Sequence, residues 1–446
     1  MAISSVARVV TDRIFGQLAK VCSNFRFATS VVVLSGGAAL GHCFTVAAAP
    51  ILARLYLPHE IGNLGLFSAF LGVIVVAASL QYDVAIVSAP GQKEAAHLAT
   101  LSTLFALPMS VAGGLLLYVM IHFSLVGFGV LPKYAAGLMV PTIFFAALFS
   151  ILRYWSLRHE RFGIVANAAI FQNGGRNVSQ VALGAIGSHS SGLLLGEALG
   201  RGIGMSSMMS HAWPVVRKYA FNLRDATKTL GNNLQFPLYS MPSSFINELG
   251  TSLPLPLLVT LYGADVGGYY SLVWRVLAAP TAVIGASVAD AFHSRAALYA
   301  REDPKRLLWF FHSTTAALLA IGIVPALAIF LFGEPIFLFV FGVKWRLSGI
   351  IASIVAPWFL TSFIVSPLSR LVYVLHGQRL KLIYDVLILG GNLMVFFFAR
   401  QLSWPMLRMV TVMSGINTLS KVAYYLVLFR IAATPIRASS DGLKAN

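Results

Sequence analysis

The stretch PILARLYLPHEIGNLGLFSAFLGVIVVAASLQY, residues 50–82, decides the fold of this chain. After its Pro-containing turn, it continues as an apolar run long enough to cross a hydrocarbon core of about 30 Å as one helix. Runs of similar length recur along the chain, for example LFALPMSVAGGLLLYVMIHF at 104–123 and LLWFFHSTTAALLAIGIVPALAIFLFG at 307–333. The sequence therefore predicts an all-α integral membrane protein.

The composition agrees with a membrane protein. Of the 446 residues, 58% are hydrophobic and only 11% are charged, and the mean hydropathy is +0.80. Soluble domains contain about a quarter charged residues. The net charge is +17, but the basic residues lie between apolar runs, so membrane topology explains them and we expect no nucleic acid partner. Cys22 and Cys43 form no disulfide framework and are interpreted as free thiols.

Charges, Pro and Gly divide the chain into about twelve spans. Their predicted centres are Ala39, Ile74, Ala106, Ile143, Ile170, Ala198, Gly250, Ala279, Leu319, Pro357, Leu389 and Ile416. Lys and Arg concentrate in the N-terminus, the C-terminal tail and alternate loops, which by the positive-inside bias predicts that both termini are cytoplasmic. The first residues, 1–27, form a basic cytoplasmic segment without the apolar core and cleavage site of a secretory signal.

A phrase that occurs twice predicts an internal repeat. PILARLYLPHEIG begins at Pro50 and PLLVTLYGADVG begins at Pro256, so that Tyr56 corresponds to Tyr262 at an offset of 206, and Gly62 to Gly267 at 205. The long polar stretch 213–236 divides the chain nearly in half. We therefore expect six-helix lobes at 28–212 and 237–432, a linker between them and a cytoplasmic tail at 433–446. Lobes with an even number of spans are parallel repeats, related by a pseudo-twofold axis along the membrane normal.

Ionisable residues within spans are expensive and each needs an explanation. Two pairs are spaced four residues apart on a helix and are expected to neutralise themselves; they are Glu197 with Arg201 and Lys381 with Asp385. His42, Glu248 and Arg275 have no such local partner.

The three unpaired residues are candidates for function. His42 and Glu248 are 206 residues apart, so they occupy equivalent places beside Gly residues in the two lobes. Interrupted helices at matching places indicate a transport site. Glu248 could hold a proton or sodium ion and couple its flow to transport; the alternative is that its side chain only extends into a wet cleft. For His42, a hydrogen bond between helices is the favoured interpretation. We expect Arg275 to face an aqueous or substrate cavity.

Four further charged residues lie near the ends of spans. Asp83 and Asp290 fall at roughly matching places near the inner ends of the second and eighth spans and are candidate cavity residues. Arg54 and Arg370 are candidate contacts for an anionic headgroup, because arginine binds phosphate through a planar fork of donors. Anchoring to lipid phosphates is the simpler explanation for each of these arginines alone. Neither a metal-ligand cluster nor a motif of a known enzyme class is present in the sequence.

Two stretches carry a resemblance to a known family. The segment 53–90 has an Ala-Arg-x-x-x-Pro-x-x-x-Gly turn and a span ending in Leu-x-x-Asp-x-Ala-Ile, and the segment 267–297 has a Gly-x-Tyr start, a mid-span Pro and an exit near a Phe. Both resemble the Wzx-type polysaccharide flippases of the multidrug/oligosaccharidyl-lipid/polysaccharide exporter superfamily. The resemblance places Arg54 and Asp83 on the family's turn and span-end positions and suggests Arg275 as a substrate contact. Thr260 replaces Arg54 in the second copy of the phrase, so any role of Arg54 is not duplicated.

The resemblance implies a task. Such a flippase moves an undecaprenyl-diphosphate-linked oligosaccharide across the bacterial cytoplasmic membrane, for O-antigen, capsule or exopolysaccharide synthesis, without cofactors. A polysaccharide polymerase and a chain-length regulator are candidate partners.

Two alternatives stay open. A cation-coupled multidrug antiporter of the same fold predicts a cavity dominated by acids such as Glu248, Asp83 and Asp290. A membrane enzyme that acts on the same lipid predicts a large polar outer loop, and the outer loops here look short.

Overall fold

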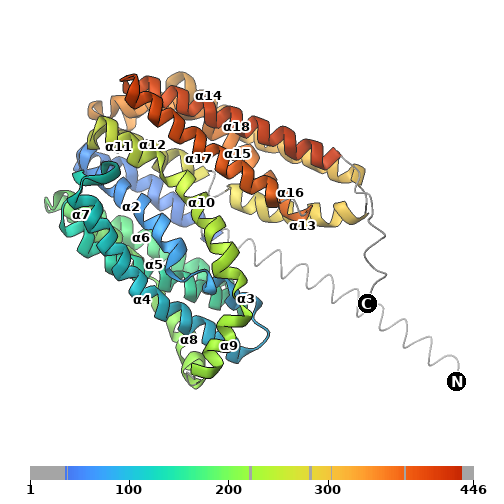
Figure 1. Cartoon of the computed structure of the whole chain (residues 1–446). Helices are drawn as coiled ribbons and strands as arrows, with labels where there is room; N and C mark the ends of the chain where they lie inside the picture. Colours follow the sequence, from blue (N-terminus) through green and yellow to red (C-terminus); the bar gives the residue numbers. More distant parts are fainter. Residues whose placement is uncertain are drawn as a thin grey trace, which may run out of the picture.

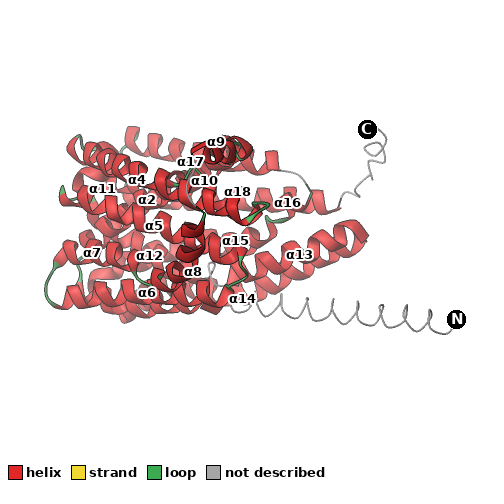
Figure 2. Cartoon of the chain, turned by 90° about the horizontal axis from the view of Figure 1, so that it is seen from below, coloured by secondary structure: helices red, strands yellow, loops and turns green. Residues whose placement is uncertain are grey.

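The computed structural model describes residues 36–37, 39–219, 223–280, 284–302, 304–375 and 378–433. Nearly all of them are helical, and no strand occurs in these ranges (Figure 2). In chain order, the elements are the helix Ala39–Leu55, α2 (Pro58–Ala78), α3 (Tyr82–Ser88), α4 (Gln92–His122), η1 (Leu125–Val130), α5 (Tyr134–Arg158), α6 (Phe162–Ala185), α7 (His189–Gly202), α8 (Met205–Lys218), α9 (Leu223–Asn232), η2 (Phe236–Ser240), α10 (Met241–Ser252), α11 (Pro254–Tyr262), α12 (Ala264–Pro280), α13 (Ala286–Glu302), α14 (Pro304–Phe341), η4 (Val343–Trp345), α15 (Arg346–Leu368), α16 (Leu371–Val374), α17 (Gln378–Gln401) and α18 (Met406–Ala433). The predicted segment 1–27 and the tail beyond residue 433 lie outside the described residues.

Every predicted span centre falls within a helix, but the helices differ in regularity. Within the described ranges, seven helices are long and apolar enough to cross a membrane. Several other spans are broken into two helices. A Gly at φ +85° separates α7 from α8, and the seventh span divides at Pro254. The second span is also interrupted, at the left-handed residues 80–81 between α2 and α3, but α2 alone is long enough to be counted. Length and hydropathy of single helices therefore undercount the spans, in part because broken spans consist of shorter helices.

The helices form two groups that meet along α2 and α12 (Figure 1). One group runs from the first helix to α8, and the other from α10 to α18. They lie together at the end where α2 and α12 begin, which we call the turn end. They diverge toward the opposite end, which carries α9 and α13 and which we call the linker end (Figure 1).

The linker itself is helical and is bound to the first group. Its α9 packs on α4, and Lys93 Nζ lies 2.7 Å from Asp225 Oδ2. The hydrogen bond from this ammonium holds the pKa of Asp225 below its usual range. The predicted stretch 213–236 therefore includes the last residues of α8, the whole of α9 and the start of η2.

The two copies of the repeated phrase face each other at the turn end. A Cβ on Gly62 would overlap the carbonyl oxygen of Ala264, and a Cβ on Gly268 would overlap that of Pro58, both well inside 3.0 Å. Small residues allow such close approach of helix backbones. The contact is reciprocal, and it pairs Gly62 with Gly268 and Pro58 with Ala264, both at an offset of 206. The predicted pairing of Gly62 with Gly267 is thus wrong by one residue, because helix packing and not letter identity sets the register.

A second reciprocal contact closes the same end. Trp345 of η4 is fully buried, and its Nε1 donates to the carbonyl of Ala53 at 2.8 Å. The adjacent Lys344 Nζ donates to the carbonyl of Tyr56 at 3.1 Å. In the equivalent place of the other group, η1 packs on α11, and Gly127 lies against the backbone of Thr260. When each half uses the same surface to contact the other half, the two halves are related by a twofold axis.

The two equivalent tyrosines of the phrase each donate a hydrogen bond to a backbone carbonyl within their own half. Tyr56 Oη donates to the carbonyl of Gln180 at 2.7 Å, and Tyr262 Oη donates to the carbonyl of Trp404 at 2.8 Å. Gln180 lies in the fifth span, and Trp404 follows the eleventh. Each tyrosine therefore links the first helix of its lobe to the fifth span of that lobe or to the loop that follows it. The repeated phrase is the turn that joins the two lobes and closes one end of the molecule.

Candidate functional site

A cavity of about 350 Å³ lies between the two lobes, and we call it the arginine chamber. Its wall is formed by the first helix, α2, α6, α7, α10, α11 and α12. The charged and hydroxyl side chains that line it are Thr45, Ser68, Arg176, Glu197, Glu248, Thr251, Ser252, Tyr270, Ser271 and Arg275. Because ligand sites are concave, contain a few convergent polar groups and lie at domain interfaces, this chamber is a candidate binding site.

Arg275 reaches across the chamber from one lobe to the other. It lies in the middle of α12, and its Nη2 donates to Asn177 Oδ1 at 2.5 Å and to Gln180 Oε1 at 3.3 Å, both on α6. Its Nε is buried and has no hydrogen-bond partner among the described residues. The prediction that Arg275 faces a cavity is confirmed by its place in the chamber wall.

A second guanidinium lies on the first-lobe side, in a network around Glu197. The Glu197 side chain is only 3% exposed, and its Oε1 lies 2.9 Å from Arg201 Nη2 and 3.6 Å from Arg176 Nη1. The predicted pair of Glu197 and Arg201 is therefore confirmed, but it belongs to a larger cluster. Arg176 Nη2 also donates to Thr45 Oγ1 and to Asn173 Oδ1, at 3.3 and 3.1 Å. A buried carboxylate with two cations leaves net positive charge beside the chamber.

Sequence reasoning missed the face of α6 that carries this network. Asn173, Arg176, Asn177 and Gln180 recur at the spacing of one helix face, in the stretch FQNGGRNVSQ at 171–180. The same polar face explains why α6, although 24 residues long, is not among the spans identified by hydropathy. A search for polar residues with helical period inside an apolar segment would have found it.

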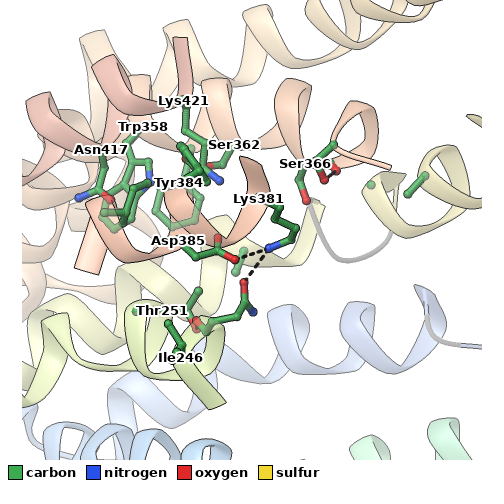
Figure 3. A pocket seen from close by; sticks show the side chains of 18 of the residues that line it. Ile246, Thr251, Trp358, Ser362, Ser366, Lys381, Tyr384, Asp385, Asn417 and Lys421 are labelled. Carbon is green, nitrogen blue, oxygen red and sulfur yellow. Dashed lines mark hydrogen bonds and ion pairs between the residues drawn. The ribbon is translucent and has the colours of Figure 1, made fainter. Parts of the chain in front are cut away.

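A larger cavity, of about 640 Å³, adjoins the first, and we call it the lysine chamber (Figure 3). Thr251 and Trp274 line both cavities, so these two side chains stand between them. The other polar and charged residues of its wall are Asn247, Ser362, Ser366, Ser369, Arg370, Lys381, Tyr384, Asp385, Asn417 and Lys421. Except for Asn247 on α10, they come from the C-terminal part of the chain, from α15 to α18.

The lysine chamber has an ion pair, a further lysine and an aromatic wall. Lys381 Nζ lies 2.6 Å from Asp385 Oδ2, which confirms the predicted pair. Lys421 Nζ lies 5.4 Å from the centre of the Tyr384 ring. Trp274 packs against Trp358, with ring centroids 5.6 Å apart. Sequence reasoning did not single out Lys421, although a lysine in an apolar span was a sufficient signal.

The remaining predicted site residues separate into two groups. Glu248 lines the arginine chamber and Arg370 lines the lysine chamber. Glu248 Oε1 accepts a hydrogen bond from Ser252 at 2.9 Å and lies so close to α2 that a Cβ on Gly72 would overlap it. Both residues therefore have access to a molecule held between the lobes.

The others lie away from the lining of both chambers. Arg54 is exposed at the turn end. His42 is partly buried on the first helix. Asp83 is buried on α3, where it accepts hydrogen bonds from Ser79 and Ser150, each at 2.6 Å. The side chain of Asp290 lies outside the described residues.

The fold is similar to those of known transporters. The lipid II flippase MurJ in an inward closed conformation matches with a TM-score of 0.65 and 15% identity, over 91% of this chain and 90% of that chain. A Pyrococcus furiosus transporter of the MOP superfamily, described as having reversed polarity of its binding pocket, matches with a TM-score of 0.60 and 14% identity, over 91% and 96%. An inward-facing multidrug resistance transporter of the MATE family matches at 0.59 and 16%, over 88% and 95%. These similarities establish the MOP-superfamily transporter fold.

The sequence comparison identifies the family. None of the curated proteins matches the chain. Residues 51–349 match the family profile described as polysaccharide biosynthesis protein. This range contains the second copy of the repeated phrase, the first copy except Pro50, and all residues of the arginine chamber except Thr45. The match covers more than half of the 446 residues. The chain therefore belongs to this polysaccharide biosynthesis protein family, and it is a multi-pass membrane protein with the fold of the MOP-superfamily transporters.

Proposed function

We propose that the protein is a flippase that moves an undecaprenyl-diphosphate-linked oligosaccharide across the bacterial cytoplasmic membrane for surface polysaccharide synthesis. One observation carries the proposal: Arg275 and Arg176 come from opposite lobes and line one cavity between them. Arginine binds phosphate oxygens through its fork of donors. A diphosphate between the two guanidinium groups is held by both lobes at once.

The closed turn end supports a mechanism of alternating access. The reciprocal contacts of Gly62 and Gly268 join the lobes at that end, whereas the lobes diverge at the linker end (Figure 1). The positive-inside bias of the loops puts the linker end in the cytoplasm. In this state the diphosphate and sugar enter from the cytoplasm, and the prenyl chain stays in lipid. Rocking of the lobes then opens the turn end to the outside, and the protein moves its substrate without changing it.

The charge of the two chambers favours a lipid-linked anion over a cationic drug. Their lining contains five basic residues and three acidic ones. Two of the acids, Glu197 and Asp385, already form ion pairs with Arg201 and Lys381. Glu248 is in no ion pair among the described residues, and it alone favours the antiporter.

The direct test is lipid exchange in liposomes. The purified protein is reconstituted with a fluorescent undecaprenyl-diphosphate oligosaccharide, and a membrane-impermeant quencher follows the fraction of lipid in the outer leaflet. We expect exchange well above that of protein-free liposomes. If the folded and inserted protein gives no lipid exchange but drives the efflux of a cationic dye, the protein is a drug antiporter and not a flippase.

Replacement of Glu248 by Gln tests coupling to protons or sodium ions. The substitution keeps the size and the hydrogen bond with Ser252 but removes the only chamber acid outside an ion pair. We expect exchange to continue at a reduced rate and to lose its dependence on pH or sodium. Glu334→Gln is the matched control, because Glu334 pairs with Arg346 and neither residue lines a chamber. Unchanged pH and sodium dependence at normal protein level would exclude Glu248 as the coupling residue.

A further inference from the structure

The lysine chamber carries more positive charge than its own acid can balance. Arg370, Lys381 and Lys421 line it together with a single carboxylate, Asp385. Figure 3 shows Lys381, Asp385 and Lys421 directed into the same space. The carboxylate is already bonded to Lys381 at 2.6 Å, so it compensates that lysine first. Glu248, an acid of the neighbouring chamber, accepts a hydrogen bond from Ser252 and does not line this cavity.

Lys421 lines this chamber and forms no ion pair with a described residue. It lies midway along α18, and its ammonium is placed over the ring of Tyr384, with 5.4 Å between Nζ and the ring centre. A cation over an aromatic face gains less free energy than the withdrawal of its charge from water costs. Natural sequences keep such intramembrane charges where a substrate or ion uses them.

The rest of the wall has the chemistry of a sugar site. Ser362 and Ser366 lie on one face of α15, Ser369 directly follows its last residue, and Asn247 and Asn417 add amide groups. Trp274 and Trp358 add aromatic rings against which the apolar side of a pyranose can pack. The hydroxyl of Tyr384 is buried and has no hydrogen-bond partner among the described residues. Hydroxyls, amides and aromatic side chains around one cavity are what a polyhydroxylated ring requires.

We propose that the lysine chamber binds an acidic sugar, with the sugar carboxylate at Lys421 and Lys381. The proposal rests on the proposed function, because it assigns the diphosphate to the adjoining arginine chamber and the oligosaccharide to this one. The two chambers are adjacent, with Thr251 and Trp274 in both linings, and the assignment places one molecule across both. A neutral repeat leaves the excess positive charge uncompensated, whereas the carboxylate of a uronic acid or of a carboxylate-bearing ketal reduces it. The substrate class is therefore an anionic glycan on a diphosphate lipid.

A binding experiment with soluble analogues tests this assignment. Two farnesyl-diphosphate-linked disaccharides differ only in the terminal sugar, glucuronic acid in one and glucose in the other. The quenching of tryptophan fluorescence reports binding, because Trp274 and Trp358 line the chamber. We expect the acidic compound to bind about tenfold or more tightly, as for a charge-assisted hydrogen bond, with the difference decreasing in high salt. Equal affinities would overturn the inference.

Variants separate this site from the diphosphate site. Lys421→Met should remove most of the preference for the acidic compound and leave the affinity for the neutral one unchanged. Arg408→Met is the matched control, because Arg408 is exposed and lies over Trp404, away from both chambers. If Lys421→Met leaves the preference intact in folded protein, the acid does not bind at this lysine and the assignment is wrong.

Failure of the inference and failure of the proposed function give different results. Equal binding of both compounds, together with exchange of the neutral lipid in liposomes, rejects the acidic sugar and keeps the flippase. Absence of binding by both compounds in folded wild-type protein rejects both. Binding of the free glucuronic acid disaccharide, without lipid, is an independent measurement of the sugar site. Weak binding that Lys421→Met abolishes supports the acidic subsite even if exchange is not observed.

Discussion

Arg275→Met is expected to abolish exchange of the lipid-linked oligosaccharide in liposomes. The substitution keeps most of the side-chain volume and removes the charge. It changes the lining of the arginine chamber from two arginines and two glutamates to one arginine and two glutamates, which repels a diphosphate. Loss of one charge-assisted hydrogen bond costs about 1.5–3 kcal/mol, or roughly a 10–150-fold loss of rate if it acts at the barrier. Loss of the positive charge adds to this, so little exchange should remain.

Two further variants identify the cause of the loss. Arg275→Lys retains the charge but not the fork that contacts Asn177 and Gln180, so exchange should recover in part. Arg408→Met removes an exposed guanidinium at the turn end and should exchange as the wild type does. Size-exclusion profiles and thermal unfolding in detergent verify that each variant is folded. Wild-type exchange by folded Arg275→Met would mean that this arginine has only a structural role, and the proposed mechanism would lose its central contact.

The layout of the fold could be predicted from the sequence because it depends on simple patterns that extend over many residues. Apolar runs set the spans, and the repeated phrase set the relation of the lobes. The structure adds what the phrase does: Tyr56 and Tyr262 each donate a hydrogen bond to a backbone carbonyl in their own half, in the fifth span for Tyr56 and just after the eleventh for Tyr262. The sequence alignment paired Gly62 with Gly267 instead of Gly268, because identical residues in an alignment do not reveal which helix backbones are in contact.

The candidate site could be predicted only in part. Arg275 was found because an unpaired charge inside a span is itself informative. Arg176 and Asn177 were missed, since their shared helix face becomes evident only when the polar residues of α6 are placed at helical period. The same limit applies to Glu197: its pairing with Arg201 followed from spacing, but its contact with Arg176 joins two helices and has no local signal.

Residues near span ends were the least predictable from sequence. Arg54 and Arg370 look alike in the sequence, yet only Arg370 lines a chamber. Asp83 is held by two hydroxyls on its own side of the molecule, Ser79 Oγ and Ser150 Oγ. Whether such a residue faces a cavity depends on the rotation of its helix against its neighbours, which tertiary packing decides.

Gly268→Val is expected to keep the turn end from closing and thereby to stop exchange. A Cβ at this position would overlap the carbonyl group of Pro58, which is backbone and cannot rotate away. The lobes must therefore separate locally or strain the helices. Overpacking of this kind costs about 1–3 kcal/mol. A bias of that size shifts a two-state equilibrium about 5–150-fold toward the state in which α2 and α12 are apart at the turn end.

The expected shift can be measured by labelling from outside intact cells. Ser271 lines the arginine chamber, so a cysteine at this position, with Cys22 and Cys43 replaced by Ser, reports access to the cavity. We expect an impermeant maleimide to label this cysteine slowly in the wild-type background and several-fold faster with Gly268→Val. The reciprocal substitution, Gly62→Ala, should act in the same direction, because its Cβ would overlap the carbonyl oxygen of Ala264.

Gly415→Val is the matched control for the turn-end substitution. Gly415 is exposed on α18, and a Cβ there would meet nothing within 4 Å, so neither labelling nor exchange should change. Normal exchange and slow labelling with Gly268→Val would show that the glycine contact is not part of the gate. Fast labelling with lost exchange would instead identify closure at the repeated phrase as one of the two states through which the lobes must pass. The reciprocal contact then explains why the phrase occurs twice: a seal between two lobes needs a matching surface on each.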